Sequence, residues 1–236
     1  MSLPFETTNW SLIIEAADEG REDSLKALDQ LCRRYRPPLL AFTRRFGLNE
    51  PDAEDATQSF FHHFIRSNLP SRASRDLGRF RSFLMVSLRN FLHTQHKHAT
   101  RERRGGGTAE HVSLDDEQHG LADRLAAEDS PEQAYDREWA RTLVRIAMDA
   151  LAAEQAAQGK AERFELMRPV LLDPERRDEI HAELCAKHDL SDGAARVVLS
   201  RLHARFRELL RAEVARIVTT PEEMDDEIAY LASHLR

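Results

Sequence analysis

The sequence predicts an all-α fold, with two small helical domains joined by a flexible acidic linker. Few segments alternate polar and apolar residues with the period of a strand, and β-branched residues form few clusters. Apolar residues instead recur every three or four positions, as in Leu25, Leu28, Leu31, Cys32 and Tyr35. Three glycines at 105–107 and an acid-rich stretch without aromatics, up to Asp129, predict the linker.

In the first half of the chain, helix ends are predicted at residues that favour them. The pair Pro37-Pro38 breaks or kinks the first helix, because proline lacks an amide hydrogen and clashes with the preceding turn. Gly47 suits a helix C-terminus, and Pro51 with Asp52 suits the first turn of the next helix. A third helix begins near Arg79, after a polar loop.

The second half predicts further helices. Ser130 caps the first of them, with Pro131 at the first helical position. Two shorter helices are predicted at roughly 161–172 and 178–188. A long helix, capped by Ser191, then runs to about residue 218.

The net charge of −7 hides a strong alternation of charge along the chain. Residues 110–138 carry ten acids against two arginines, and basic stretches lie on both sides of them. The acidic total is therefore compatible with a nucleic-acid partner, because the local distribution of charge governs binding.

Cys32 and Cys185 lie far apart in helical patterns and are expected to be reduced, buried thiols. No signal segment starts the sequence, and it contains no run of 18 apolar residues. These features predict a soluble, cytoplasmic protein.

Residues 51–65, PDAEDATQSFFHHFI, predict an amphipathic helix with an acidic outer face. Helical spacing groups the apolar residues Ala53, Ala56, Phe60, Phe61 and Phe64. The opposite face carries Glu54, Asp55, Gln58, Ser59 and His62. Thr57 lies about 40° from Ala53 on the helical wheel and should face inward, whereas Ser59 should face outward. This acidic face suits a basic partner surface.

The next helix, from residue 79 to 104, combines cations with aromatic residues. Its cations, against the single acid Glu102, are Arg79, Arg81, Arg89, Lys97, Arg101, Arg103 and Arg104. Most of its apolar residues are expected in the core; these are Phe80, Phe83, Leu84, Leu88, Phe91 and Leu92. The cations and the polar residues Asn90, His93, Thr94 and His96 suit single-stranded nucleic acid, which needs charge for phosphates and planar groups for bases.

Residues 176–214 predict a helix-turn-helix, with its turn centred on Asp189 and Leu190. The second helix has an inward stripe of Ala195, Val198, Leu199, Leu202, Phe206 and Leu209. Its outward row is Arg196, Ser200, His203, Arg207 and Arg211. A recognition helix presents such donors to base edges and phosphates. The same pattern would also fit two packed helices with a solvated basic face.

The sequence gives no sign of catalysis. The glycines at 105–107 lack the preceding strand and the Gly-Lys-Ser/Thr ending of a phosphate-binding loop, and no Gly-x-Ser-x-Gly occurs. His93, His96 and His98 have no neighbouring cysteine or carboxylate that would complete a metal site. We therefore expect neither an enzyme nor a bound metal or cofactor.

In their order along the chain, residues 51–65, 78–92 and 190–218 resemble bacterial RNA polymerase sigma factors of the extracytoplasmic-function type. The segment TTNWSLIIEAADEG at 7–20 is similar to the start of one subgroup of these factors. The resemblance implies region 2 over 1–104, a linker over 105–130, region 4 over 131–218 and an acidic-apolar tail over 219–236. A sigma factor binds core polymerase and directs promoter recognition without catalysis of its own.

The resemblance also implies roles for individual residues. Docking on the clamp helices of the polymerase β′ subunit falls to Glu54, Asp55, Gln58 and Ser59. Recognition of the promoter −10 element falls to Arg79, Arg81, Arg89, Asn90, His93 and Lys97. Recognition of the −35 element falls to Arg196, Ser200, Arg201, His203 and Arg207. The polymerase β flap and promoter DNA complete the implied partners, and no membrane partner is expected.

Two positions depart from the family pattern. Ser59 stands where family members commonly carry an acid, so docking on a basic surface should be weaker. Phosphorylation would add about −1.5 to −2 charges. The resemblance suggests Thr57 as its site, whereas the helix geometry favours Ser59. Two modes of control of such a factor are compatible with the sequence: a Ser/Thr kinase and an anti-sigma factor. In the helix-turn-helix, the usual glycine of the turn is absent, and residues 187–189 (Lys-His-Asp) occupy its place.

Two alternatives stay open at this point. The chain could be a stand-alone helix-turn-helix regulator whose N-terminal half is a sensor or dimerisation domain. It could also be a helical adaptor without a nucleic-acid partner. The acidic helix at 51–65 separates the first alternative from a sigma factor, because an autonomous regulator has no use for a polymerase-docking face.

Overall fold

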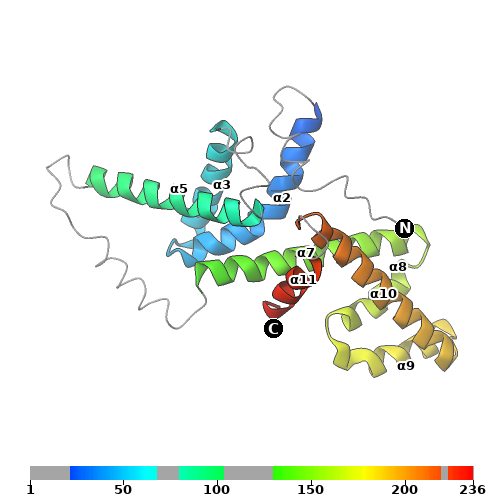
Figure 1. Ribbon diagram of the computed structural model, residues 1–236. Helices are drawn as coiled ribbons and strands as arrows, with labels where there is room; N and C mark the ends of the chain where they lie inside the picture. Colours follow the sequence, from blue (N-terminus) through cyan, green and yellow to red (C-terminus); the bar gives the residue numbers. More distant parts are fainter. Residues whose placement is uncertain (1–21, 68–79, 104–129, 219–222, 236) are drawn as a thin grey trace. The chain divides into compact units, whose positions relative to one another are not determined.

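The computed structural model describes residues 22–67, 80–103, 130–218 and 223–235 (Figure 1). Every regular element in these ranges is a helix, which confirms the all-α prediction for this part of the chain. The elements are α2 (Glu22–Arg45), α3 (Glu50–Arg66), α5 (Phe80–Arg103), α7 (Pro131–Ala157), α8 (Ala161–Met167), two 3-10 turns (Arg168–Leu171 and Pro174–Arg176), α9 (Arg177–His188), α10 (Asp192–Ala215) and α11 (Glu223–Ser233). None of the helices described is both long and apolar enough to cross a membrane.

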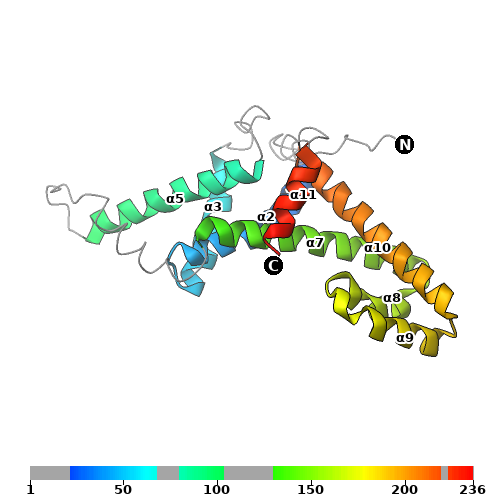
Figure 2. The same ribbon diagram turned by 60° about the horizontal axis from the view of Figure 1, so that its bottom comes forward.

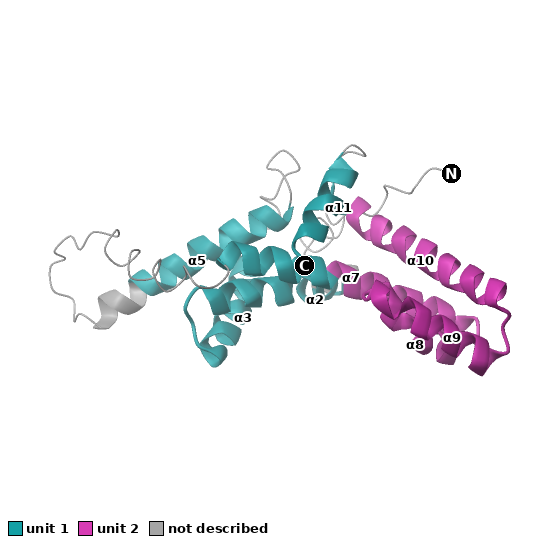
Figure 3. Cartoon of the chain, turned by 90° about the horizontal axis from the view of Figure 1, so that it is seen from below, with its two compact units in different colours: residues 1–142, 216–236 teal, residues 143–215 magenta. Residues whose placement is uncertain are grey.

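The chain forms two compact units, which Figure 3 colours separately. Unit 1 comprises residues 1–142 and 216–236, and unit 2 comprises residues 143–215. The division therefore falls within α7, whereas the sequence places a domain start at residue 131. The predicted linker at 105–130 lies outside the described residues, apart from Ser130.

The core of unit 1 is built by α2, α3, α5 and the first half of α7. Tyr35 of α2 stacks on Trp139 of α7, with ring centroids 4.8 Å apart and planes 11° from parallel. The Tyr35 ring also meets Phe80 of α5 edge to face at 5.2 Å. Because these contacts bury Tyr135 and Trp139 against the N-terminal helices, the first turns of α7 belong to unit 1.

Helix α2 passes through Pro37 and Pro38 without interruption, so of the two predicted alternatives the break is wrong, and a kink is compatible with the continuous helix. Each proline costs a helix about 3 kcal/mol. Burial of an apolar side chain returns about 1.5–3 kcal/mol. Leu31, Tyr35, Leu39 and Leu40 lie on both sides of the prolines, and all are buried. Tertiary packing thus outweighs the local preference of the two prolines.

Other predicted helix ends are confirmed. Pro51 lies in the first turn of α3, which Asn49 caps by accepting a hydrogen bond from the Asp52 amide at 2.9 Å. Ser130 caps α7: its hydroxyl accepts from the Gln133 amide at 3.1 Å, and the Gln133 side chain accepts from the Ser130 amide at 2.9 Å. This reciprocal pair forms a capping box.

Unit 2 encloses its own hydrophobic core. The second half of α7, α8, the 3-10 turn Arg168–Leu171, α9 and α10 all contribute to one cluster, which includes Leu151, Phe164, Ile180, Leu184, Leu199 and Phe206. Helices α9 and α10 pack against each other and against this cluster (Figure 1). The predicted inward stripe of α10 is confirmed, because four of its six members are buried and the other two are half-buried.

The turn between α9 and α10 is built around Asp189. Its backbone is left-handed, with φ 50° and ψ 43°, and among non-glycine residues of the described ranges it alone has positive φ. Aspartate tolerates this conformation better than most residues. Asp189 therefore takes the conformation that a glycine would supply. Ser191 then caps α10, accepting from the Ala194 amide at 3.3 Å.

The stability of Asp189 variants should depend on how easily the new residue adopts a left-handed backbone conformation. We expect Asp189→Gly to be at least as stable as the wild type, because glycine adopts positive φ without a steric penalty. We expect Asp189→Val to lower the free energy of unfolding by about 1–2 kcal/mol. Urea unfolding would measure both. Lys187→Val, at an exposed helical position nearby, is the control; equal losses for the two valine variants would contradict the expectation.

Candidate nucleic-acid interface

The predicted docking face of α3 lies mostly on the surface. Asp55, Gln58 and Ser59 are exposed, and Glu54 is half-buried. The Glu54 carboxylate pairs with the Arg36 guanidinium of α2. Asp55 therefore offers the more accessible negative charge, while Glu54 is partly neutralised within the protein.

Thr57 lies beneath that face, as helical geometry predicts, and is only 1% exposed. Its hydroxyl donates to the Ala53 carbonyl at 2.7 Å. The Thr43 hydroxyl of α2 lies 3.2 Å away and donates to the Leu39 carbonyl at 2.8 Å. A kinase reaches a hydroxyl only at the surface, so phosphorylation at Thr57 would require α3 to separate from α2. Ser59 is exposed and needs no such opening.

Helix α5 presents a polar outer face towards its C-terminal half. Asn90, His93 and Lys97 are exposed, whereas Arg89 is half-buried and paired with Glu132 of α7. Arg79 lies outside the described residues. Of the predicted core aromatics, Phe80 is buried and Phe83 and Phe91 are half-buried.

The imidazole of His93 is held in a cationic environment. Its ring contacts Phe46 edge to face, with centroids 5.2 Å apart. Partial burial, followed by the charges of Arg89, Lys97 and His96, lowers the pKa of His93. The lowered pKa favours a neutral ring, so His93 can donate or accept a hydrogen bond without adding charge.

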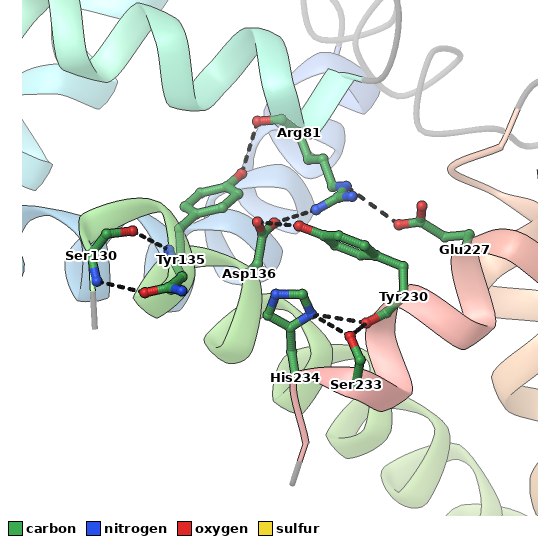
Figure 4. A network of polar contacts seen from close by, with 9 residues as sticks. Arg81, Ser130, Tyr135, Asp136, Glu227, Tyr230, Ser233 and His234 are labelled. Carbon is green, nitrogen blue, oxygen red and sulfur yellow. Dashed lines mark hydrogen bonds and ion pairs between the residues drawn. The ribbon is translucent and has the colours of Figure 1, made fainter. Parts of the chain in front are cut away.

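Arg81 is placed differently from the sequence-based expectation of an exposed DNA-binding cation. Its side chain is 8% exposed and lies between Asp136 of α7 and Glu227 of α11 (Figure 4). The Glu227 Oε1 atom is 3.3 Å from Arg81 Nε. Burial alone would lower the pKa of Arg81, but the charges of Glu227 and Asp136 outweigh burial and raise it. Arg81 is thus a buried, permanently charged group whose contacts are internal.

The tyrosines around Arg81 complete this cluster. The Tyr135 hydroxyl donates to the Arg81 carbonyl at 3.0 Å, and the Tyr230 hydroxyl donates to Asp136 Oδ2 at 2.5 Å. The Tyr230 ring lies 4.9 Å from the Arg81 guanidinium carbon, in cation–π geometry. The sequence pattern did not indicate roles for Asp136, Glu227 and Tyr230. The spacing of Met224, Glu227 and Leu231 was the available signal that the tail packs as a helix.

Helix α10 exposes four of the five residues predicted to read the −35 element. These are Arg196, Ser200, Arg201 and Arg207. Arg196 forms an ion pair with Asp192 one turn earlier, at 3.0 Å. His203 is half-buried, and its Nε2 atom is buried without a hydrogen-bond partner among the described residues. Burial, followed by Arg177 and Arg207, lowers the pKa of His203. The outward row predicted for α10 is therefore interrupted at His203.

One further arginine of α10 is engaged within unit 2. Arg205 donates to both carboxylate oxygens of Glu154 of α7, at 2.9 and 2.6 Å, and to Glu208 at 2.7 Å. The hydrogen bond from Arg205 is the main cause that lowers the pKa of Glu154. Arg205 therefore joins α10 to α7. The sequence pattern did not reveal this pair, because its members are 51 residues apart. Of the exposed cations of α10, Arg196 and Arg207 share a face, whereas Arg201 lies one turn before Arg205 on the same side of the helix.

Comparison of the chain with protein-family models, with curated proteins and with solved structures found no match. Within the described ranges, no group of three or more His, Cys, Asp or Glu side chains is arranged to hold a metal ion.

Proposed function

We propose that the chain is a sigma factor of the extracytoplasmic-function type, which binds core RNA polymerase in the cytoplasm and directs it to promoters. One observation carries this proposal: a single chain holds a helix-turn-helix with an exposed basic second helix and, separately, a helix with an exposed acidic face. The first feature suits duplex DNA and the second suits a basic protein surface. A stand-alone DNA-binding regulator would need only the first.

The helix-turn-helix of α9 and α10 supports contact with the −35 element. Arg196, Ser200 and Arg201 lie on the surface of the first turns of α10, where a recognition helix meets base edges. Arg207 lies two turns further on, where a cation contacts the phosphate backbone. Because His203 is half-buried, we assign the contacts to the four exposed residues and to His203 only a supporting position.

The exposed residues of α5 support contact with the −10 element. Asn90, His93 and Lys97 offer hydrogen bonds and one cation on a surface that flanks partly exposed aromatic rings. Such a mixture suits the separated strand of melted DNA. On α3, the exposed residues Asp55 and Gln58 supply the face for the polymerase β′ clamp helices.

The double variant Glu54→Lys/Asp55→Lys should lose polymerase binding but keep its fold. We expect reversal of these two charges to weaken binding to core polymerase by at least about 30-fold, equivalent to about 2 kcal/mol. A pull-down with bacterial core polymerase, followed by run-off transcription, would measure the loss. Far-UV circular dichroism would show that the variants remain folded.

Glu162→Lys with Glu165→Lys is the matched control, because it reverses two exposed carboxylates of α8. This control should bind polymerase as the wild type does. Undiminished transcription by the Glu54/Asp55 variant would refute the assignment of the docking face. Sequence-specific duplex binding by the wild type, together with no binding to polymerase, would favour the stand-alone regulator instead.

A further inference from the structure

Val197 is an apolar residue on the exposed side of α10, the second helix of the helix-turn-helix. It is 47% exposed, whereas its neighbours Val198 and Leu199 pack into the core of unit 2. Figure 2 shows the first turns of α10 beside α9, and among the described helices of unit 2 none covers the opposite side. Val197 therefore contributes little to the core of unit 2.

Helix propensity does not account for a valine at this position either. A β-branched side chain loses rotamer freedom in a helix, so valine is less favourable there than alanine. Burial of the side chain normally offsets this loss. Single exposed apolar residues are nevertheless common on protein surfaces, so exposure alone is not evidence of a contact. The place of Val197 among the cations of α10 supplies that evidence.

Cations lie on both sides of Val197 around the helix axis. Viewed along the helix, Arg196 and Arg207 lie on one side of Val197, and Arg201 lies about 40° away on the other. All three arginines are exposed. A helix in the major groove turns its central residues towards the base edges, and cations at its sides reach the outer base edges and the phosphates. Val197 thus occupies the central position of such a helix.

The residues that share this central row with Val197 have short side chains. Gly193 precedes it by one turn, Ser200 and Ala204 follow it by one and two turns, and all three are exposed. The first acid on this side is Glu208, three turns further on, and its carboxylate accepts a hydrogen bond from Arg205 at 2.7 Å. The first turns of α10 can therefore approach a base pair closely, with the methyl groups of Val197 foremost.

We propose that Val197 reads a thymine in the major groove, by van der Waals contact between its methyl groups and the C5 methyl group of the base. That methyl group is the apolar feature that a base pair presents in the major groove, and cytosine lacks it. Valine in a helix strongly prefers one rotamer, so its methyl groups are in place before binding and little entropy is lost.

This inference rests on the proposed function in one respect: it takes α10 to be a helix that reads duplex DNA. It does not require polymerase, and it would hold equally for a stand-alone regulator. The polymerase and the thymine contact can therefore be tested separately.

The test first identifies the duplex. The full-length protein, alone and with bacterial core polymerase, selects bound sequences from a library of duplexes with a randomised segment. Each thymine that recurs at a fixed position is then replaced by deoxyuridine, which lacks only the C5 methyl group, and binding of the labelled duplex is measured by fluorescence anisotropy. We expect one replacement to weaken wild-type binding about fourfold, the effect of exposing one buried methyl group.

Val197→Ala connects this loss to the valine. Alanine is a better helix former, so the variant should remain folded. It should bind the thymine duplex about fourfold more weakly than the wild type does, and it should bind the deoxyuridine duplex equally well.

Two controls should keep the fourfold loss on replacement of the thymine. Leu172→Ala truncates another exposed apolar residue of unit 2, which is 63% exposed, and should bind both duplexes as the wild type does. Arg207→Gln should weaken binding to both duplexes by the same factor, because a phosphate contact does not distinguish the bases.

An equal loss on deoxyuridine replacement in the wild type and in Val197→Ala would overturn the proposal, because another residue would then contact the methyl group. So would selected duplexes in which no replacement of a thymine weakens binding.

The outcomes also separate this proposal from the sigma assignment. A sequence selected only with core polymerase, but without any effect of deoxyuridine, would keep the sigma assignment and overturn the thymine contact. A deoxyuridine effect that Val197→Ala abolishes, in a chain that does not bind polymerase, would keep the thymine contact and overturn the sigma assignment. Selection of no sequence, with or without polymerase, would overturn both.

Discussion

Trp139→Ala is expected to lower the free energy of unfolding of unit 1 by about 3–5 kcal/mol, the usual range for truncating a buried tryptophan. Trp139 is fully buried and stacks on Tyr35, which in turn meets Phe80. Alanine would leave a cavity where α2, α5 and α7 meet. Since a small domain is stable by only about 5–15 kcal/mol, this loss should unfold a large fraction of the molecules on mild heating.

Urea titration followed by far-UV circular dichroism would measure this loss. Leu172→Ala is the control, because Leu172 is 63% exposed and its truncation should change stability by less than about 0.5 kcal/mol. Trp139→Phe should lose much less than Trp139→Ala: it keeps a ring against Tyr35 and removes an indole N–H that has no hydrogen-bond partner among the described residues. Similar losses for the phenylalanine and alanine variants would contradict this account of the core.

Thr57→Glu should destabilise unit 1 by about 3–5 kcal/mol, because it leaves an uncompensated charge buried between α2 and α3. The introduced carboxylate would lie against Thr43 and the Ala53 carbonyl, and both present oxygen atoms to it. A glutamate there cannot imitate a functional phosphate without opening the helix pair. Thermal unfolding followed by circular dichroism would measure the loss.

Ser59→Glu is the matched variant two residues away, on the exposed face of α3. It should change stability by less than about 0.5 kcal/mol. If the sigma assignment is right, it should also strengthen pull-down by core polymerase, because it adds the carboxylate that this face lacks. A folded Thr57→Glu variant with raised transcription activity would contradict this expectation. It would mean that α2 and α3 separate readily, and that Thr57 is the regulatory site.

Helical periodicity was sufficient to predict the faces of α3 and the inward stripe of α10. Ala53 and Thr57 are buried and Asp55 and Ser59 are exposed, because on a regular helix the angle between residues fixes which of them face the core. Helix starts at Asn49 and Ser130 also follow local rules, since a cap joins residues only three apart. Features that depend on neighbouring residues were therefore accessible from the sequence.

Features that depend on distant residues were not accessible. Pro37 and Pro38 indicated a helix break or kink, and only the packing of α2 on the rest of unit 1 prevents the break. Arg81 looked like an exposed cation of a basic helix, because Asp136 and Glu227 approach it from other helices. His203 fitted the outward row of α10 by angle, yet the neighbouring helices leave it half-buried. In each case a tertiary contact decided the outcome.

The stack of Trp139 on Tyr35 also provides an intrinsic optical reporter for one half of the molecule. Residues 143–215 contain no tryptophan, so tryptophan emission originates entirely in unit 1. Circular dichroism reports the helices of both units together. Following the two signals through one denaturant titration would therefore show whether the units unfold in a single transition or one after the other.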